Sequence, residues 1–441
     1  MDSLHPQLDP QLTPQSPPGY AVPRQSIPFA VKPKELLLAI LSYPLAFLYA
    51  EAVTIGGVTQ PVRNGNPVGF ILFALFSVLF CLGTESRHRD VRAGWERWVW
   101  LGCMALCIIY PLWGGDEVWD GWSSLFAHGF AIYYVLCRAN VLLEGRTSHL
   151  LPLDALWGAV VFPFKHFFLR IRVIWSALHM RGKGRGMAIL WSALAVAAAA
   201  GAFILAGNLL AKADKGFAQL AQSLFARQRF ELGSFFSTLL FSLPAGAYIY
   251  GLVVGTGREE PEEIRVRGNR ICEGLEKLRA VPVQVWIALL GVFALLYGVF
   301  FVIQGRYLFG AFTRTLPEDF TVAEYARQGF FELCRVMVLN FALLWAALRS
   351  AGESVKTHRG LRIAATVILV ESLLLAVTAG SKLWLYIDCF GFTPLRLQSA
   401  WLIAVLSAGV IAALWSLWTN LRSVRAWAIF SGVSLALLHL I

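Results

Sequence analysis

Long apolar runs separated by short polar segments dominate this 441-residue chain. Runs such as residues 187–211 and 281–303 exceed the roughly 20 apolar residues that a helix needs to cross the hydrocarbon core of a bilayer. We therefore expect an all-α fold, a polytopic integral membrane helical bundle of about 11 transmembrane helices. The predicted spans are residues 35–55, 67–84, 97–114, 120–138, 187–211, 233–255, 281–303, 329–349, 361–386, 398–419 and 423–441.

The same pattern divides the chain into four predicted segments. Residues 1–34 hold eight of the 19 prolines and no apolar periodicity, which is typical of a disordered cytoplasmic tail. Residues 35–149 form a first membrane segment of four helices, and residues 187–441 form a membrane core domain. Residues 150–186 mix aromatic and basic positions, so we expect an amphipathic segment in the cytoplasmic interface, its cations near anionic headgroups. A re-entrant hairpin is the alternative for this segment.

Composition and charge agree with a membrane protein. Apolar residues make up 57% of the chain and charged residues 15%, where a soluble protein carries about a quarter. The net charge of +11 lies in short loops between apolar runs rather than on a soluble domain, which excludes a nucleic-acid-binding role. With a cytoplasmic N-terminus, 27 Lys and Arg flank the inner ends of the spans and 10 flank the outer ends. This bias predicts an N-in, C-out protein.

Three polar residues lie deep in the predicted eighth and ninth spans. Arg335 and Asn340 are on the eighth and Glu371 is near the middle of the ninth. A carboxylate at mid-membrane costs at least ~2.5–3.5 kcal/mol, so we expect Glu371 to be paired or protonated. These residues predict either a proton or substrate site or an interhelical polar clamp without turnover.

A second polar set is expected at the outer ends of the same helices. Glu332 lies one turn before Arg335, and Lys382 lies about three turns outward from Glu371, where its ammonium reaches the interface. A Gly-Phe-Thr-Pro turn follows at residues 391–394 and holds an anion or caps the next helix. The outer rim candidates are Tyr307, Tyr325, Arg327, Tyr386, Thr393 and Arg396.

No cofactor or metal site is predicted. The seven cysteines fall mostly within apolar runs and show neither paired metal-ligand spacing nor a disulfide framework. The segment 257–280, rich in Glu and Arg, is expected to be a solvated helical hairpin tip.

Several of these polar runs also resemble a known family. They are residues 304–310 (QGRYLFG), 325–333 (YARQGFFEL), and 382–386 (KLWLY) followed by 390–396 (FGFTPLR). They are similar to signature runs of a bacterial multi-pass membrane family of domains of unknown function, the related 4153 and 4173 groups. Residues 209–217 resemble a further run, although Lys212 stands where a smaller residue is usual. The resemblance covers the second half of the chain best. It implies a bacterial inner-membrane protein and brings no established activity.

Three function hypotheses follow. The first is a transporter or permease-like protein, with a polar site open to the extracytoplasmic face, Glu371 as its ionisable group and a small-molecule or lipid-linked substrate. The second is an envelope enzyme acting on a lipid-linked or acylated substrate at the outer leaflet, with Glu332, Glu371 or the loop acids Asp116 and Asp120. The third is a non-catalytic membrane partner of a sensor or assembly complex.

Overall fold

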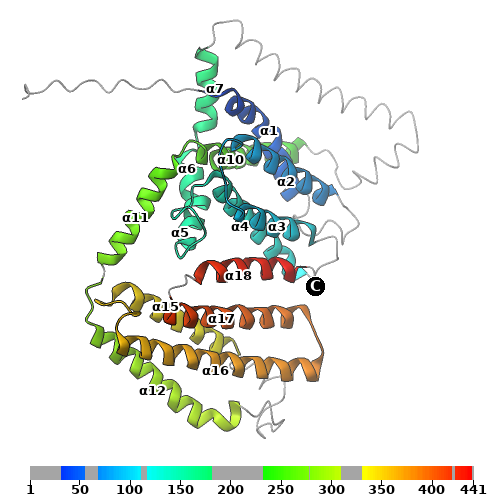
Figure 1. Ribbon diagram of the computed structural model, residues 1–441. Coiled ribbons are helices and arrows are strands. Elements are labelled where there is room, and N and C mark those ends of the chain that lie inside the picture. The colour runs from blue at the N-terminus through cyan, green and yellow to red at the C-terminus, as the bar shows by residue number, and fades with distance from the viewer. Residues whose placement is uncertain are drawn as a thin grey trace, which may run out of the picture.

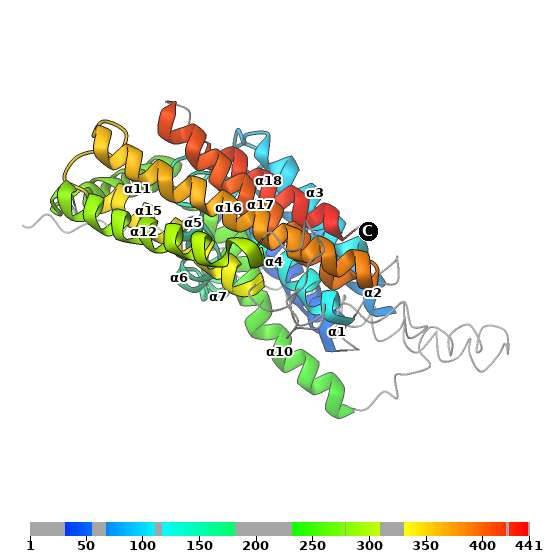
Figure 2. The ribbon, with the colours of Figure 1, turned by 90° about the horizontal axis from the view of Figure 1, so that it is seen from below.

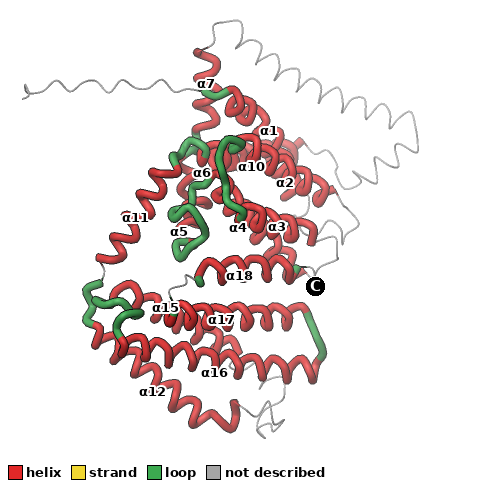
Figure 3. The backbone as a smooth tube through the Cα atoms, in the orientation of Figure 1, coloured by secondary structure: helices red, strands yellow, loops and turns green. Residues whose placement is uncertain are grey.

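The computed structural model describes residues 31–54, 68–110, 117–180, 232–277, 279–308, 330–419 and 423–439. In these ranges the chain is a set of helices joined by short loops, and the one extended pairing is an isolated bridge between Val281 and Ala351 (Figure 3). Seven described helices are long and apolar enough to cross a membrane. The prediction of an all-α fold is confirmed, and the helices indicate a membrane protein.

The first half of the chain forms an N-terminal bundle. Its helices are α1 (Pro33–Thr54), α2 (Val68–Arg87), α3 (Glu96–Ile109), α4 (Glu117–Ala139) and α10 (Leu232–Tyr250), which continues into the π-helix η3 (Gly251–Gly255). α1 and α10 pack closely because Gly246 has no side chain; a Cβ there would lie 2.8 Å from the Cβ of Ala46. The core includes the fully buried Tyr134 and Leu136 of α4.

Short helices close the loop side of this bundle. They are α5 (Leu151–Leu156), η2 (Trp157–Val161), α6 (Phe162–Lys165) and α7 (Leu169–Met180). Phe162 and Val173 are buried against the bundle, whereas Phe164, Phe168 and Trp175 are exposed. This segment therefore has one packed face and one aromatic outer face.

A C-terminal bundle follows, and α11 (Pro261–Lys277) leads to it (Figure 1). Its helices are α12 (Val283–Leu308), α15 (Phe330–Ser350), α16 (Arg359–Phe390) and α17 (Pro394–Trp418). The fully buried Leu290, Met337, Ile368 and Leu375 form its centre. With 32 residues, α16 is about 48 Å long and exceeds the ~30 Å hydrocarbon core.

The last helix, α18 (Val424–Leu438), joins the two bundles and lies between α17 and α3 (Figures 1 and 2). At its start, Arg425 Nε donates to Glu96 Oε1 of α3 at 2.6 Å. Further along, Trp427 Nε1 donates to the Val405 carbonyl of α17 at 2.9 Å, and Gly432 packs under the ring of Trp100. The two bundles are therefore connected by the packing of α18 and also by α11, which runs from one to the other.

Ten of the predicted spans coincide with a described helix, and the span 187–211 lies outside the described residues. α3 has 14 residues and α18 has 15, so neither reaches the length of a full span. The tail 1–30 and all of residues 181–231 also lie outside the described residues. In segment 257–280 the expected solvated helix is present as α11, which buries Ile264 and Gly268 against the N-terminal bundle and leaves its other residues at least partly exposed.

Candidate functional site

A cavity of about 870 Å³ lies where the two bundles meet, between α4, α15, α16, α17 and α18. We call it the rim cavity. Most of its wall is apolar, and its polar groups come from the start of α17 and the end of α16. The lining residues are Trp122, Phe126, Phe330, Phe331, Leu383, Tyr386, Thr393, Pro394, Leu395, Arg396, Gln398, Ser399, Trp401, Leu402 and Leu435.

Among the described residues that line the rim cavity, Arg396 is the one that carries a charge. Its guanidinium lies over the Tyr386 ring, 4.2 Å from the centroid, and 5.9 Å from the centroid of Phe390. Its Nη1 donates to the carbonyl oxygen of Gly391. A guanidinium has five N–H donors, so this arrangement fixes the group and keeps donors for a ligand.

The turn that positions Arg396 follows from its sequence. Gly391 ends α16 at φ +77°, ψ −179°, a backbone conformation that is essentially restricted to glycine. Thr393 is extended and Pro394 begins α17, where its missing N–H costs nothing. The tight turn expected from the Gly and Pro spacing is therefore present, and it directs Tyr386, Thr393 and Arg396 to one cavity.

A second polar group on the cavity wall is Gln398. Its side-chain nitrogen is buried and has no hydrogen-bond partner among the described residues. A buried amide without a partner costs about 1–3 kcal/mol. Ser399, by contrast, donates to the Leu395 carbonyl of its own helix at 3.0 Å. Gln398 is therefore the more available hydrogen-bonding group for a ligand.

The deep polar residues form a separate cluster. Asn340 of α15 is buried; its Oδ1 accepts from Tyr297 Oη of α12 at 2.7 Å and its Nδ2 donates to Ser372 Oγ of α16 at 2.9 Å. Glu371 is half-buried beside Ser372, and its Oε2 has no hydrogen-bond partner among the described residues. Glu371 precedes Leu383 by 12 residues on α16, a separation of about 18 Å along the helix. The deep cluster and the rim cavity are therefore distinct places.

The other candidates lie outside both groups. Arg335 and Glu332 are both exposed on α15, and Arg335 is on the side of the helix away from Asn340. Lys382 is half-buried on α16, and Glu332 is near enough to attract its ammonium electrostatically. Tyr307 falls in the last turn of α12 without a described side chain, and Tyr325 and Arg327 lie outside the described residues.

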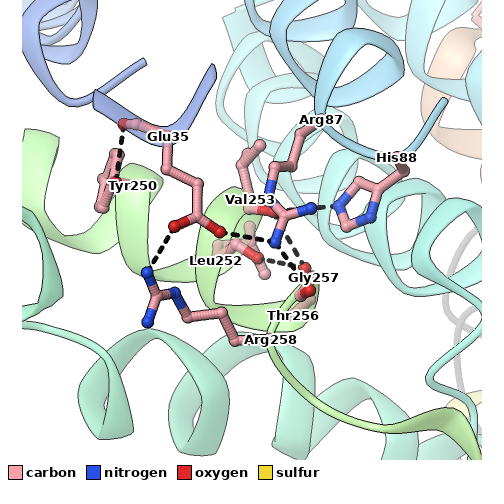
Figure 4. A network of polar contacts seen from close by, with 9 residues as sticks. All are labelled: Glu35, Arg87, His88, Tyr250, Leu252, Val253, Thr256, Gly257 and Arg258. Carbon is pink, nitrogen blue, oxygen red and sulfur yellow. Dashed lines mark hydrogen bonds and ion pairs between the residues drawn. The ribbon is translucent and has the colours of Figure 1, made fainter. Parts of the chain in front are cut away.

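A buried ion network at the loop end of the N-terminal bundle was missed by sequence reasoning (Figure 4). Glu35 of α1 is 1% exposed and pairs with Arg87 of α2 at 2.9 Å and with Arg258. Arg87 also donates to the Gly257 carbonyl at 2.7 Å, and Tyr250 Oη donates to the Glu35 carbonyl at 2.9 Å. Successive spans cross the membrane in opposite directions, so the start of the first predicted span and the ends of the second and sixth lie on the same side. This shared side was the one feature of the sequence that could have brought Glu35, Arg87 and Arg258 together.

Two titratable groups beside this network have shifted pKa values. Burial lowers the pKa of His88 from 6.5 to about 4, and the charge of Arg87 acts in the same direction. His88 Nε2 lies 3.0 Å from the Val253 carbonyl oxygen. Burial acts to raise the pKa of Glu259, but hydrogen bonds from His166 and Lys165 outweigh it and hold that pKa at about 2. Glu259 is therefore ionised and joins α6 to the loop before α11.

The comparisons with known proteins give a family and no activity. The family model described as "Domain of unknown function (DUF4153)" matches residues 99–441, from α3 to the end of the chain. No curated protein and no solved structure matches. Because the match covers more than three quarters of the sequence, the chain belongs to the DUF4153 family of proteins of unknown function.

Proposed function

We propose that this protein is a permease-like membrane protein that binds an amphiphilic anion in the rim cavity. The observation that carries the proposal is the composition of that cavity, whose described lining is an apolar and aromatic wall with one fixed guanidinium at Arg396. Its volume of about 870 Å³ lies in the range typical of ligand sites. The apolar wall suits acyl or polyprenyl chains, and the guanidinium suits a carboxylate or phosphate head.

The groups that line the cavity favour binding over bond-breaking. They are aromatic, aliphatic, hydroxyl, amide and guanidinium groups. Such groups hold and orient a ligand, and among the described lining residues the phenol of Tyr386 is the only side chain of the types that commonly transfer protons in catalysis. In this proposal Glu371 is the ionisable group that couples proton movement to transport, because it lies mid-helix with an oxygen that lacks a described partner. Asn340 of α15 has a supporting role through its hydrogen bond to Ser372, next to Glu371, whereas Arg335 is exposed and lies outside this cluster.

Binding by the purified full-length protein tests the proposal. A fluorescent phosphatidylglycerol analogue should bind more tightly than its phosphatidylcholine counterpart in detergent or nanodiscs. Arg396→Gln should weaken the anionic ligand about 10–100-fold, since a hydrogen bond to a charged group contributes about 1.5–3 kcal/mol. Trp401→Ala should weaken both ligands, because it removes apolar wall.

Arg335→Gln is the matched control, since it also removes one exposed guanidinium but on α15 outside the cavity. Equal losses for Arg335→Gln and Arg396→Gln would contradict the proposed site. Protein-dependent, Glu371-dependent flux of the bound lipid across liposomes would support the permease role. Conversion of the lipid into a new species would favour an envelope enzyme instead. If the lipid binds but is neither transported nor converted, a non-catalytic partner is favoured.

We propose a bacterial inner-membrane location with the N-terminus in the cytoplasm, so that the rim cavity opens to the extracytoplasmic side. The 27-to-10 distribution of Lys and Arg supports this orientation. Cys389, which is exposed beside the cavity, should react with an impermeant maleimide added outside. In a chain lacking the other cysteines, Glu353→Cys, in the exposed loop between α15 and α16, should react only after permeabilisation. The reverse pattern would overturn the orientation.

The same orientation gives residues 150–186 a place in the cytoplasmic interface. The exposed Phe164, Phe168 and Trp175 provide an apolar outer face for α6 and α7. Arg170 is instead buried, where its Nη2 donates to the Leu243 carbonyl at 2.9 Å. The segment therefore combines packing on the bundle with aromatic contact to lipid, and Arg172 is a candidate for anionic headgroups.

A further inference from the structure

Three side chains with metal-binding atoms meet at the loop end of the N-terminal bundle. Glu144 and His149 belong to the loop between α4 and α5, and Cys272 belongs to α11. One ligand atom from each residue, a carboxylate oxygen, an imidazole nitrogen and the thiol sulfur, lies within 4.8 Å of the others. His149 Nδ1 and Glu144 Oε1 are 3.5 Å apart.

We propose that Glu144, His149 and Cys272 form a binding site for a divalent transition metal ion of the zinc class. Tetrahedral zinc with bonds of 2.0–2.3 Å places neighbouring ligand atoms about 3.3–3.6 Å apart, so the observed spacing needs only small side-chain rotations. Nitrogen and sulfur donors select zinc, cobalt and similar ions over magnesium and calcium, which prefer oxygen ligands. Three protein ligands leave a fourth position for water.

The loop that carries two of these ligands is held in a defined shape. Asp154 Oδ1 accepts from the backbone N–H of Leu143 at 2.8 Å, immediately before Glu144. The carboxylate of buried Glu96 accepts from the backbone N–H of Thr147 at 3.0 Å, two residues before His149. Gly145 adopts φ +70°, a left-handed conformation that lets the chain reverse between the two ligands. A site with ligands positioned in this way is partly preorganised.

Cys272 reaches the loop because of a glycine one turn earlier on α11. Gly268 lies against the carbonyl of Leu143, and a Cβ at this position would overlap the oxygen. Residues four apart share one face of a helix, so this contact aims Cys272 at the same loop. The metal ion would therefore join α11 to the N-terminal bundle. At its other end α11 leads to Val281, whose N–H donates to the Ser350 carbonyl of the C-terminal bundle at 3.0 Å.

Cobalt binding to the full-length protein in detergent, after treatment with a chelator, tests the site. We expect one Co²⁺ per chain, with a near-ultraviolet thiolate-to-metal band that Zn²⁺ displaces. Cys272→Ser should abolish the band, and Glu144→Gln and His149→Ala should weaken binding. Cys389→Ser, at an exposed cysteine on α16, should leave the band unchanged. Absence of the band from the wild type, or its survival in Cys272→Ser, would overturn the proposal.

Two further measurements do not depend on folding of the ligand variants. In wild-type protein, Zn²⁺ at 100 times its Kd should slow alkylation of Cys272 about 100-fold, because only the metal-free fraction reacts. Gly268→Ala should weaken the metal about 10–100-fold, as expected when a group that positions a ligand is displaced. Gly274→Ala, on the same helix with open space around the new Cβ, should have no effect. If Zn²⁺ does not slow alkylation of Cys272, or if the two glycine variants have equal effects on metal affinity, the proposed site is wrong.

Discussion

The two bundles differ in how they handle polar groups. In the N-terminal bundle and its short helices the structure buries five charged residues, Glu35, Glu96, Arg138, Asp154 and Arg170. Among the described side chains of α12, α15, α16 and α17 the buried polar residues are all neutral: Asn340, Ser372, Thr378 and Ser381. The N-terminal bundle is therefore held by charged contacts, and the described part of the C-terminal bundle by neutral ones.

This difference indicates which helices can rearrange with the smallest cost in free energy. Removing one partner of a buried ion pair leaves a charge without compensation and costs about 3–5 kcal/mol, so such contacts keep helices fixed. A neutral hydrogen bond between membrane helices contributes about 0.6–2 kcal/mol. We therefore expect the N-terminal bundle to act as a rigid frame and the helices around Asn340 to rearrange more easily. The rim cavity lies between the two bundles, so such a rearrangement would change its shape.

The largest effect is expected for Glu35→Ala, which leaves Arg87 and Arg258 beside each other without their carboxylate. The free energy of unfolding in detergent should fall by about 3–5 kcal/mol, measured by chemical denaturation. Glu262→Ala is the control, because its side chain is 78% exposed and pairs with Arg265 only at the surface, which predicts a change below about 1 kcal/mol. Similar losses for both variants would contradict a rigid, charge-held frame.

Acid should weaken the same bundle through His88. Its pKa is about 4 in the folded protein and near 6.5 when unfolded, so the unfolded chain binds more protons between these pH values. The contribution of His88 is complete above pH 6.5 and is lost as the pH falls toward 4, in total about 3 kcal/mol. Unfolding of wild type and His88→Gln from pH 7 to 4 measures it; parallel profiles would show that His88 is not the titrating group.

A smaller effect is expected in the C-terminal bundle. Tyr297→Phe and Ser372→Ala each remove one hydrogen bond to Asn340 and should each lower the free energy of unfolding by about 0.6–1.7 kcal/mol. Ser381→Ala is matched to Ser372→Ala, since both hydroxyls are buried on α16 and donate to their own backbone. If Ser381→Ala costs as much as Ser372→Ala, the Asn340 contact contributes nothing measurable between helices.

The smallest effect on stability is expected for Glu371→Gln. Because Glu371 Oε2 has no described hydrogen-bond partner, the free energy of unfolding should change by less than about 0.5 kcal/mol. Lipid flux in liposomes should nevertheless fall, since the variant cannot carry a proton. A stability loss as large as that of Ser372→Ala, with flux unchanged, would make Glu371 a structural contact.

Much of the fold follows from the sequence alone. The length of the apolar runs determines the helices, since a helix satisfies the backbone hydrogen bonds of a lipid-spanning segment within that one segment. The Gly391 to Pro394 turn was also foreseeable, because the conformational limits of glycine and proline are local. The same local chemistry indicated that Thr393 and Arg396 lie together at the start of α17.

Contacts between distant segments were decided only by the tertiary structure. Glu35, Arg87 and Arg258 come from α1, α2 and the turn before α11, and Glu144, His149 and Cys272 have no spacing that marks a metal site in the sequence. The rotation of α15 about its own axis was also not predictable from the sequence. It buries Asn340 and exposes Arg335, although both lie on this one apolar helix. Apolar periodicity gives helix length, but the side chains that face each other depend on how the helices pack.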